Sequence, residues 1–134
     1  MNCVLDACAM IAYLRGEEGA DAVSSLLVDP AVICYAHAIN LCEVYYDFVR
    51  TADLKTARSA LRDLSSVGIR NRNDMNAMFW RRAGELKGTI RKVSFADCFA
   101  IAISEVLDAE IITSDHHEFD ALVRNGVCRA RFIR

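Results

Sequence analysis

Residues 2–12 read Asn-Cys-Val-Leu-Asp-Ala-Cys-Ala-Met-Ile-Ala, an apolar stretch interrupted by one acid, Asp6. The short apolar run before Asp6 predicts a buried strand over residues 2–5, because strands covered on both faces carry few polar residues. The apolar residues that follow predict a short helix from Ala7 to Leu14. The stretch therefore indicates an α/β protein in which a carboxylate stands at the junction between a buried strand and a helix.

The same alternation continues along the chain. Further strands are expected at residues 31–35 and 110–113, at 127–133, and as a shorter segment that begins at Ile69. Helices are expected at residues 17–28, 37–49, 53–67, 74–87 and 94–107, with a short one through Leu122; Gly68 and Gly88 are expected to end two of them. This order predicts a three-layer α/β/α sandwich around a short, mainly parallel sheet, forming a single domain over residues 1–134.

The composition excludes several classes of protein. Charged residues make up 25% and hydrophobic residues 54% of the 134 positions, which excludes a disordered chain. The six cysteines show no zinc-site spacing and no disulfide pattern, so we expect free thiols in a reducing compartment, the cytoplasm. No signal peptide and no apolar run of membrane-spanning length is recognisable, and the surplus of apolar residues points to a subunit or partner interface.

Four carboxylates lie where a buried core is expected. Asp6 and Asp115 each follow a predicted strand, Asp97 lies in an apolar helix, and Glu43 lies within an apolar helix face. Ionised carboxylates in such surroundings are costly unless they are paired or bind a metal. Ligands in open α/β sheets bind beyond the carboxyl ends of the strands, so we expect the four acids to converge at that edge.

Each acid also has a purely structural interpretation. Asp6 and Asp115 are suitable N-caps for the helices that follow them, and the Ser94-x-x-Asp97 spacing resembles a capping box. Glu43 could pair with an arginine. The neighbouring His116 and His117 point apart on a helix or turn, which favours a role at a helix start over shared ligation of a metal.

If the acids converge, their hard oxygen ligands suit Mg²⁺ or Mn²⁺ rather than zinc or copper. Such ions activate an attacking water and stabilise a leaving oxygen, which implies a phosphodiester substrate. A metal-dependent phosphatase of another α/β family is a weaker alternative, since no Asp-x-Asp follows the first strand and no glycine-rich phosphate loop is present.

The segments around these acids resemble the PIN-domain family, and within it the VapC-type ribonuclease toxins of toxin–antitoxin modules. The matching segments, in order, are Val4-Leu5-Asp6 with Ile11-Ala12-Tyr13-Leu14, Asn40-Leu41-Cys42-Glu43-Val44-Tyr45, Ser94-Phe95-Ala96-Asp97, and Ile112-Thr113-Ser114-Asp115 with Phe119. Each motif alone is weakly specific, but four of them in order cover essentially the whole chain.

The resemblance implies a Mg²⁺- or Mn²⁺-dependent endoribonuclease that acts as a toxin, with a cognate antitoxin partner and a homodimeric state. It implies that Asp6, Glu43, Asp97 and Asp115 form the metal site, with Asp6 and Asp97 as principal ligands. Residues in supporting polar positions are Asn40, Ser94, Thr113 and, as a further acid, Asp120. The family usually has hydroxyl residues after its first aspartate, whereas this chain has Ala7 and Cys8, which leaves open a non-catalytic RNA-binding or scaffold module.

The net charge of −2 results from alternating charged blocks. Residues 1–49 carry −6 and residues 93–120 carry −7, while residues 50–92 carry +7 and residues 121–134 carry +4. The acidic blocks contain all four predicted ligands. The basic block 50–92 supplies candidate contacts to RNA phosphates, namely Arg70, Arg72, Arg81, Arg82, Arg91 and Lys92. The alternative is that these side chains only solvate outward helix faces.

Overall fold

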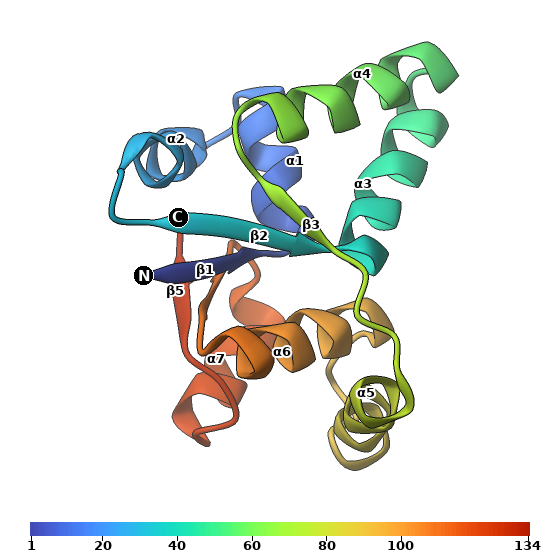
Figure 1. The fold of residues 1–134 in the computed structure, drawn as a ribbon, viewed down its shortest axis with the longest axis vertical. Coiled ribbons are helices and arrows are strands. Elements are labelled where there is room, and N and C mark those ends of the chain that lie inside the picture. The colour runs from blue at the N-terminus through green and yellow to red at the C-terminus, as the bar shows by residue number, and fades with distance from the viewer.

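The computed structural model describes residues 1–134 and contains one five-stranded sheet with helices on both faces (Figure 1). The strands are β1 (Asn2–Leu5), β2 (Ile33–His37), β3 (Arg70–Arg72), β4 (Glu110–Thr113) and β5 (Ala130–Phe132). They lie in the order β3-β2-β1-β4-β5, and every neighbouring pair is parallel. The predicted α/β/α sandwich is confirmed, and its sheet is entirely parallel.

The helices follow the predicted order with shifted ends. They are α1 (Ala7–Arg15), α2 (Ala20–Val28), α3 (Ala38–Thr51), α4 (Leu54–Ser66), α5 (Ala77–Thr89), α6 (Phe95–Leu107) and α7 (His116–Arg124). Helices α1–α4 lie on one side of the sheet and α5–α7 on the other (Figure 1). None of the helices combines the length and the apolar composition needed to cross a membrane.

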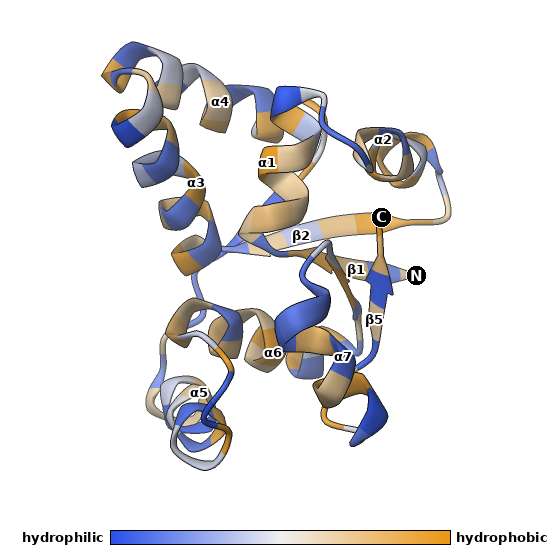
Figure 2. Ribbon diagram, turned by 180° about the vertical axis from the view of Figure 1, so that it is seen from behind, coloured by the Kyte–Doolittle hydropathy of each residue, from blue (hydrophilic) through white to orange (hydrophobic).

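Side-chain alternation along the strands divides the core between the two faces of the sheet. Cys3 and Leu5 of β1 pack into one buried cluster with α1 and α2, while Val4 packs into the other with α5 and α6. Ile112 and Ile111 of β4 divide in the same way. Because successive strand residues point to opposite faces, a short apolar run can serve both layers. The predominantly hydrophobic colouring of α6 in Figure 2 agrees with its burial between the sheet and α5.

Several predicted element ends differ from the structure, two of them for identifiable reasons. The predicted strand 31–35 is displaced to Ile33–His37, because residues 29–32 form a turn in which the Asp29 side chain accepts from the Ala31 amide. The strand predicted over 127–133 pairs only from Ala130 to Phe132. Gly88 does not end its helix: α5 continues to Thr89, since a helical glycine costs only about 1 kcal/mol and Leu86 is buried beside it.

Candidate metal site

Two of the predicted acids stand at neighbouring strand ends. Asp6 follows β1 and Asp115 lies just beyond β4, and β1 and β4 are adjacent in the sheet. The Asp6 amide also donates to the Ile112 carbonyl, 3.1 Å away, which extends the strand pairing to the acid itself. The parallel topology therefore brings these two carboxylates to the same edge, as the strand order of an open α/β sheet requires.

Both aspartates act as helix caps. One carboxylate oxygen of Asp6, Oδ1, accepts a 2.9 Å hydrogen bond from the Ala9 amide at the start of α1. Oδ1 of Asp115 accepts from the Glu118 amide at the start of α7, at 3.0 Å. A carboxylate has two oxygens, so the capping role and a ligand role are compatible. The predicted structural interpretation is confirmed for both residues and leaves Asp6 Oδ2 free of any hydrogen bond.

The N-terminus of α6 carries Asp97 to the same place. The Ser94 hydroxyl oxygen caps α6 by accepting from the Asp97 amide at 3.1 Å, which confirms the predicted cap. The first turn of α6 is connected to α3, because the Asn40 side-chain amide donates to the Ala96 carbonyl at 3.4 Å. Asn40 is fully buried and its Oδ1 has no partner.

The tightest acidic cluster consists of Asp97, Asp115 and Glu118, each of which offers one oxygen within 4.8 Å of the other two. Glu118 was not among the predicted site residues. It lies three positions after Asp115, in the first turn of α7, and the Asp-x-x-Glu spacing of a helix start was the signal available in the sequence. The structure thus adds one acid to the predicted set.

Glu43 faces this cluster from α3 without pairing with an arginine. No ion pair involves Glu43, and its pKa is raised by burial and by the nearby charge of Glu118. Asp47, one turn further along α3, lies instead between Arg15 at 2.7 Å and Arg50 at 2.6 Å. The two acids of one helix therefore have different roles: Asp47 is neutralised by cations, and Glu43 is not.

Asp120, expected as a further acid, is half-exposed on α7 and bonds His116 at 3.0 Å. The other ring nitrogen of His116 contacts the Arg134 carbonyl at 2.8 Å, and the ring stacks on Phe132. His116 and His117 are the first two residues of α7, which agrees with the helix-start interpretation. The sequence did not indicate His37, whose buried ring caps α3 through Nδ1 and bonds the Asp74 carbonyl through Nε2.

Burial favours the protonated forms of Asp6 and Asp97 when no cation is present. Burial raises the pKa of Asp6 to about 7, although the Thr113 side chain and the Ala9 amide both act to lower it. Burial also raises the pKa of Asp97, with further contributions from the Glu118 side chain and from Asp6. The Thr113 hydroxyl, which acts to lower the pKa of Asp6, accepts from the Asp115 amide at 3.0 Å.

The residues present fit a divalent cation. Of the four buried side-chain oxygens without a hydrogen-bond partner, three belong to this site: Asp6 Oδ2, Asn40 Oδ1 and Glu118 Oε2. Unpaired buried oxygens of this kind are costly, and hard cations such as Mg²⁺ select such oxygen ligands. The donor set thus offers carboxylates from the residue after β1, from α6 and from the start of α7, with Glu43 of α3 beside them.

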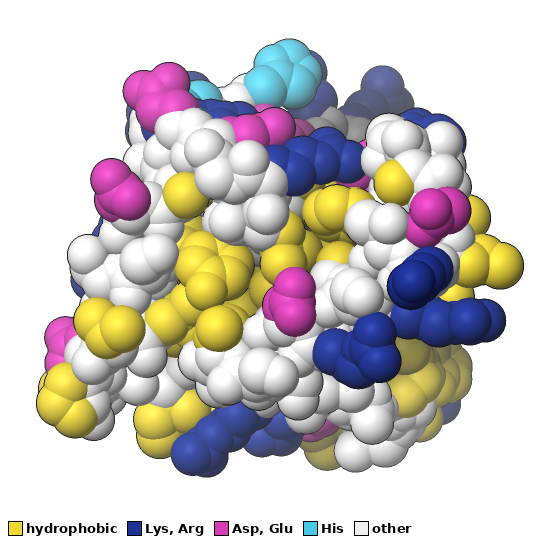
Figure 3. Space-filling view, turned by 90° about the horizontal axis from the view of Figure 1, so that it is seen from above, with side chains coloured by type: hydrophobic (Ala, Val, Ile, Leu, Met, Phe, Trp, Pro, Cys, Tyr) yellow, Lys and Arg dark blue, Asp and Glu magenta, His cyan; other side chains and the backbone are white.

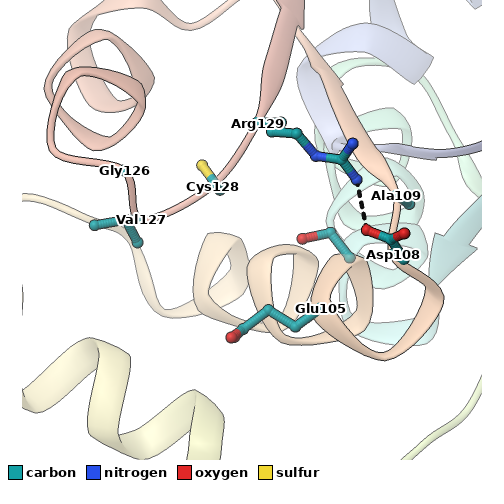
Figure 4. Close-up of a pocket in the computed structure, with 8 residues that line it drawn as sticks. Glu105, Asp108, Ala109, Gly126, Val127, Cys128 and Arg129 are labelled. Carbon is teal, nitrogen blue, oxygen red and sulfur yellow. Dashed lines mark hydrogen bonds and ion pairs between the residues drawn. The ribbon is translucent and has the colours of Figure 1, made fainter.

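The hollow shown in Figure 4 is separate from this site. Its lining includes Asp108, Ala109 and Arg129, at the opposite end of the sheet where β4 and β5 begin, and its volume is about 220 Å³. Arg129 bonds Asp108 across it at 2.8 Å. The acids of this hollow are therefore not part of the carboxylate cluster.

Together, the parallel sandwich and the acids at its carboxyl edge define an α/β protein with a candidate divalent-cation site. The sequence matches the PIN domain family over residues 3–125, and the chain belongs to this family. A search of curated protein sequences finds no match.

Solved structures with the same fold include several toxin–antitoxin proteins. VapBC2 from Rickettsia felis, bound to a promoter DNA fragment, is 16% identical with a TM-score of 0.73 over 98% of both chains. DNA-bound VapBC from Salmonella typhimurium is 14% identical with a TM-score of 0.74 over 100% of this chain and 99% of the other. VapC20 from Mycobacterium tuberculosis, a sarcin–ricin loop cleaving toxin, is 16% identical with a TM-score of 0.73 over 89% and 94%.

Proposed function

We propose that the chain is a Mg²⁺- or Mn²⁺-dependent endoribonuclease that hydrolyses RNA phosphodiester bonds as the toxin of a toxin–antitoxin pair. The observation that carries the proposal is the cluster of Asp97, Asp115 and Glu118 beside the unpartnered Asp6 Oδ2. Membership of the PIN domain family and similarity in fold to an RNA-cleaving toxin support the choice of RNA as substrate.

The chain's own residues would hold the ion and position the reacting groups. When bound, the cation supplies positive charge that polarises the phosphate and activates water as a nucleophile. Asp6, Asp97, Asp115 and Glu118 would provide its ligands, while Ser94, Asn40 and Thr113 fix the acids or the helices that carry them. Glu43, which is held near the cluster without a cationic partner, is the residue best suited to accept a proton from the attacking water.

The proposal is tested by RNA cleavage with Mg²⁺ or Mn²⁺, comparing the wild type with Asp97→Asn. We expect the variant to lose at least about 100-fold in cleavage rate, in keeping with removal of a principal electrostatic group of a catalytic site. The matched control is Asp21→Asn, which removes an exposed carboxylate in the first turn of α2. Equal cleavage by the wild type and Asp97→Asn would show that the acids are not the catalytic site.

Calorimetric titration with Mg²⁺ or Mn²⁺ distinguishes the nuclease from a non-catalytic module. If the chain is a metal-dependent nuclease, the wild type should bind the cation and Asp97→Asn should not. Retained RNA binding without any cation binding would instead select the RNA-binding or scaffold alternative, in which the acids have only their capping roles.

The partner proposal concerns the face formed by α1, α3 and α4. Figure 3 shows hydrophobic side chains gathered in a hollow on this side of the molecule. Two cavities of about 320 and 150 Å³ lie there, and both are lined by Leu14 and Asp63. An apolar hollow of this kind suits an apolar segment of an antitoxin, and we propose that the C-terminal segment of that antitoxin covers the metal site.

The cytoplasm is the proposed compartment, in which the six unbridged cysteines stay reduced.

Co-expression with the product of the adjacent reading frame tests the antitoxin proposal. Leu14→Asp should weaken the complex that the wild type forms with that product. Light scattering of the purified chain tests the proposed homodimer. A stable complex unaffected by Leu14→Asp would contradict this location of the partner.

A further inference from the structure

A groove opens directly beside the carboxylate cluster. It has a volume of about 340 Å³ and lies between α7 and residues 89–93, which are the last residue of α5 and most of the loop that leads to α6. Glu118 belongs both to the groove wall and to the acidic cluster. A molecule in the groove would therefore lie next to anything held at the metal site.

The groove has the composition of a nucleotide-binding surface. Val93 and Leu122 are buried and form its apolar part, together with the half-buried Ile90 and Ala121. Its exposed rim carries Arg91 and Lys92 from the loop, His117 from α7, and Asn125, which follows α7. Sites for single-stranded nucleic acid combine such cations, which contact the backbone, with surfaces on which sugars and bases pack.

The two cations of the rim are free to contact a ligand. Arg91 and Lys92 take part in none of the nine ion pairs of the structure. By contrast, the predicted RNA contact Arg72 is bound to Asp74 at 2.9 Å, and Arg82 is bound to Glu105 at 2.8 Å. Among the six basic residues predicted from sequence, Arg91 and Lys92 thus combine freedom from ion pairs with a position beside the acids.

The loop that carries these cations is held in place at both ends. The Lys87 ammonium donates to the Val93 carbonyl at 2.8 Å, and the Ile90 amide donates to the Leu86 carbonyl at 2.9 Å. Immediately after Val93, Ser94 caps α6 and fixes Asp97. Because the same short segment links the cations to a metal-site acid, their separation is set before any ligand binds.

We infer that this groove binds the nucleotide of single-stranded RNA adjacent to the phosphate that is cleaved, with Arg91 and Lys92 contacting its backbone phosphates. This inference rests on the proposed nuclease function and specifies which side of the site the RNA crosses. A polyanion is repelled by the acidic cluster itself, so attraction must come from cations nearby. Arg82 lines another groove of about 340 Å³ but is bound to Glu105, whereas Arg91 and Lys92 are free of ion pairs and line the groove that shares Glu118 with the cluster.

The test is fluorescence anisotropy of a labelled single-stranded RNA in EDTA, where cleavage cannot occur, as a function of salt. Arg91→Ala/Lys92→Ala should weaken binding about tenfold and reduce the slope of log affinity against log salt by about 1.4, or 0.7 for each lost phosphate contact. The control is Lys55→Ala/Arg58→Ala, which removes two exposed, unpaired cations from α4, on the other side of the sheet. Equal losses in the two double variants would overturn the inference.

A third variant tests occupancy of the groove without changing charge. Ala121→Leu narrows the groove and should weaken RNA binding several-fold while leaving the salt slope unchanged. Unchanged affinity in this variant would contradict an RNA lying in the groove. A wild type that binds RNA with this pattern but never cleaves it with Mg²⁺ or Mn²⁺ would count against the proposed function alone. If the wild type cleaves RNA but neither Arg91→Ala/Lys92→Ala nor Ala121→Leu changes the RNA affinity, the result would count against the groove alone.

Discussion

At the scale of the residue, the two oxygens of the Asp6 carboxylate have different surroundings. Asp6 caps α1 with one oxygen and leaves the other buried and unpaired. Such an arrangement is costly for folding, because an ionised oxygen in a dry site without a partner loses its hydration. The cost is explained if the free oxygen belongs to a cation site, since a bound cation would remove the penalty that the folded chain otherwise carries.

The structure and the sequence favour different acids of α7, which gives a direct test. Glu118→Gln should weaken Mg²⁺ binding at least about tenfold, because Glu118 clusters with Asp97 and Asp115. Asp120→Asn should change the affinity far less, since its carboxylate is half-exposed and bound to His116. Calorimetric titration of both variants with Mg²⁺ provides the measurement, and a greater loss in Asp120→Asn would refute the cluster.

At the scale of the element, the backbone between α1 and α2 shows how packing limits the sequence. Gly19 precedes α2 with a φ of 97°, a conformation that favours glycine. A Cβ at this position would lie 2.8 Å from the Ile133 side chain and 3.0 Å from its carbonyl oxygen. The turn can therefore pack against the chain's C-terminal segment only because residue 19 has no side chain.

Two glycines should respond oppositely to alanine. Gly19→Ala should destabilise the protein by about 1–3 kcal/mol through backbone strain and overlap with Ile133. Gly84→Ala should stabilise it by about 0.5–1 kcal/mol, because Gly84 lies inside α5 and an added Cβ meets nothing within 4 Å. Chemical denaturation of both variants measures the free energies of unfolding. The same sign of change in both would contradict this account.

At the scale of the whole molecule, charge is segregated between the site and the surrounding helices. Acids from both acidic blocks meet at the carboxyl edge of the sheet, where burial raises the pKa values of Asp6, Glu43 and Asp97. The groove cations lie beside this edge on the α5–α7 side. A near-neutral net charge thus coexists with a site suited to a cation and an adjoining surface suited to a polyanion.

The metal-free protein should lose stability as the pH rises from 6.5 to 8.0. The folded-state pKa of Asp6, about 7, exceeds its unfolded value of about 4, so its contribution is full below that unfolded value and is lost as the pH rises through 7. Above pH 6.5 the buried His37, whose pKa is lowered, stays neutral and does not offset this loss. We expect the Tm to fall by roughly 3–5 °C for each 1 kcal/mol lost.

Calorimetric melting at the two pH values measures this effect. Added Mg²⁺ should restore the Tm at pH 8.0, since a ligand that binds only the folded state stabilises it. Asp97→Asn should raise the metal-free Tm at pH 8.0, because it removes one of the buried charges that repel each other. A Tm that increased with pH in the absence of metal would contradict the charge assignment.

The sequence alone was enough for most of the fold and for most of the candidate site. Apolar runs ending in Asp6 and near Asp115 locate two buried strands, and helical periodicity locates the helices, because local burial imposes these patterns directly. Element ends were less accurate: the turn at Asp29 and the continuation of α5 past Gly88 depend on hydrogen bonds and packing that residue types do not determine.

Only the tertiary structure decided which side chains lie together in the acidic cluster and which cations are already held in ion pairs. Arg72, Arg82 and Arg91 are equivalent candidates in the sequence. In the structure, Arg72 is paired with Asp74 and Arg82 with Glu105, whereas Arg91 forms no ion pair. Glu118 joined the cluster because the cap at Asp115 turns the first helical turn of α7 toward Asp97. Residue types and periodicity determine burial along one element, whereas contacts between elements far apart in sequence depend on strand order and helix placement, which only the folded chain fixes.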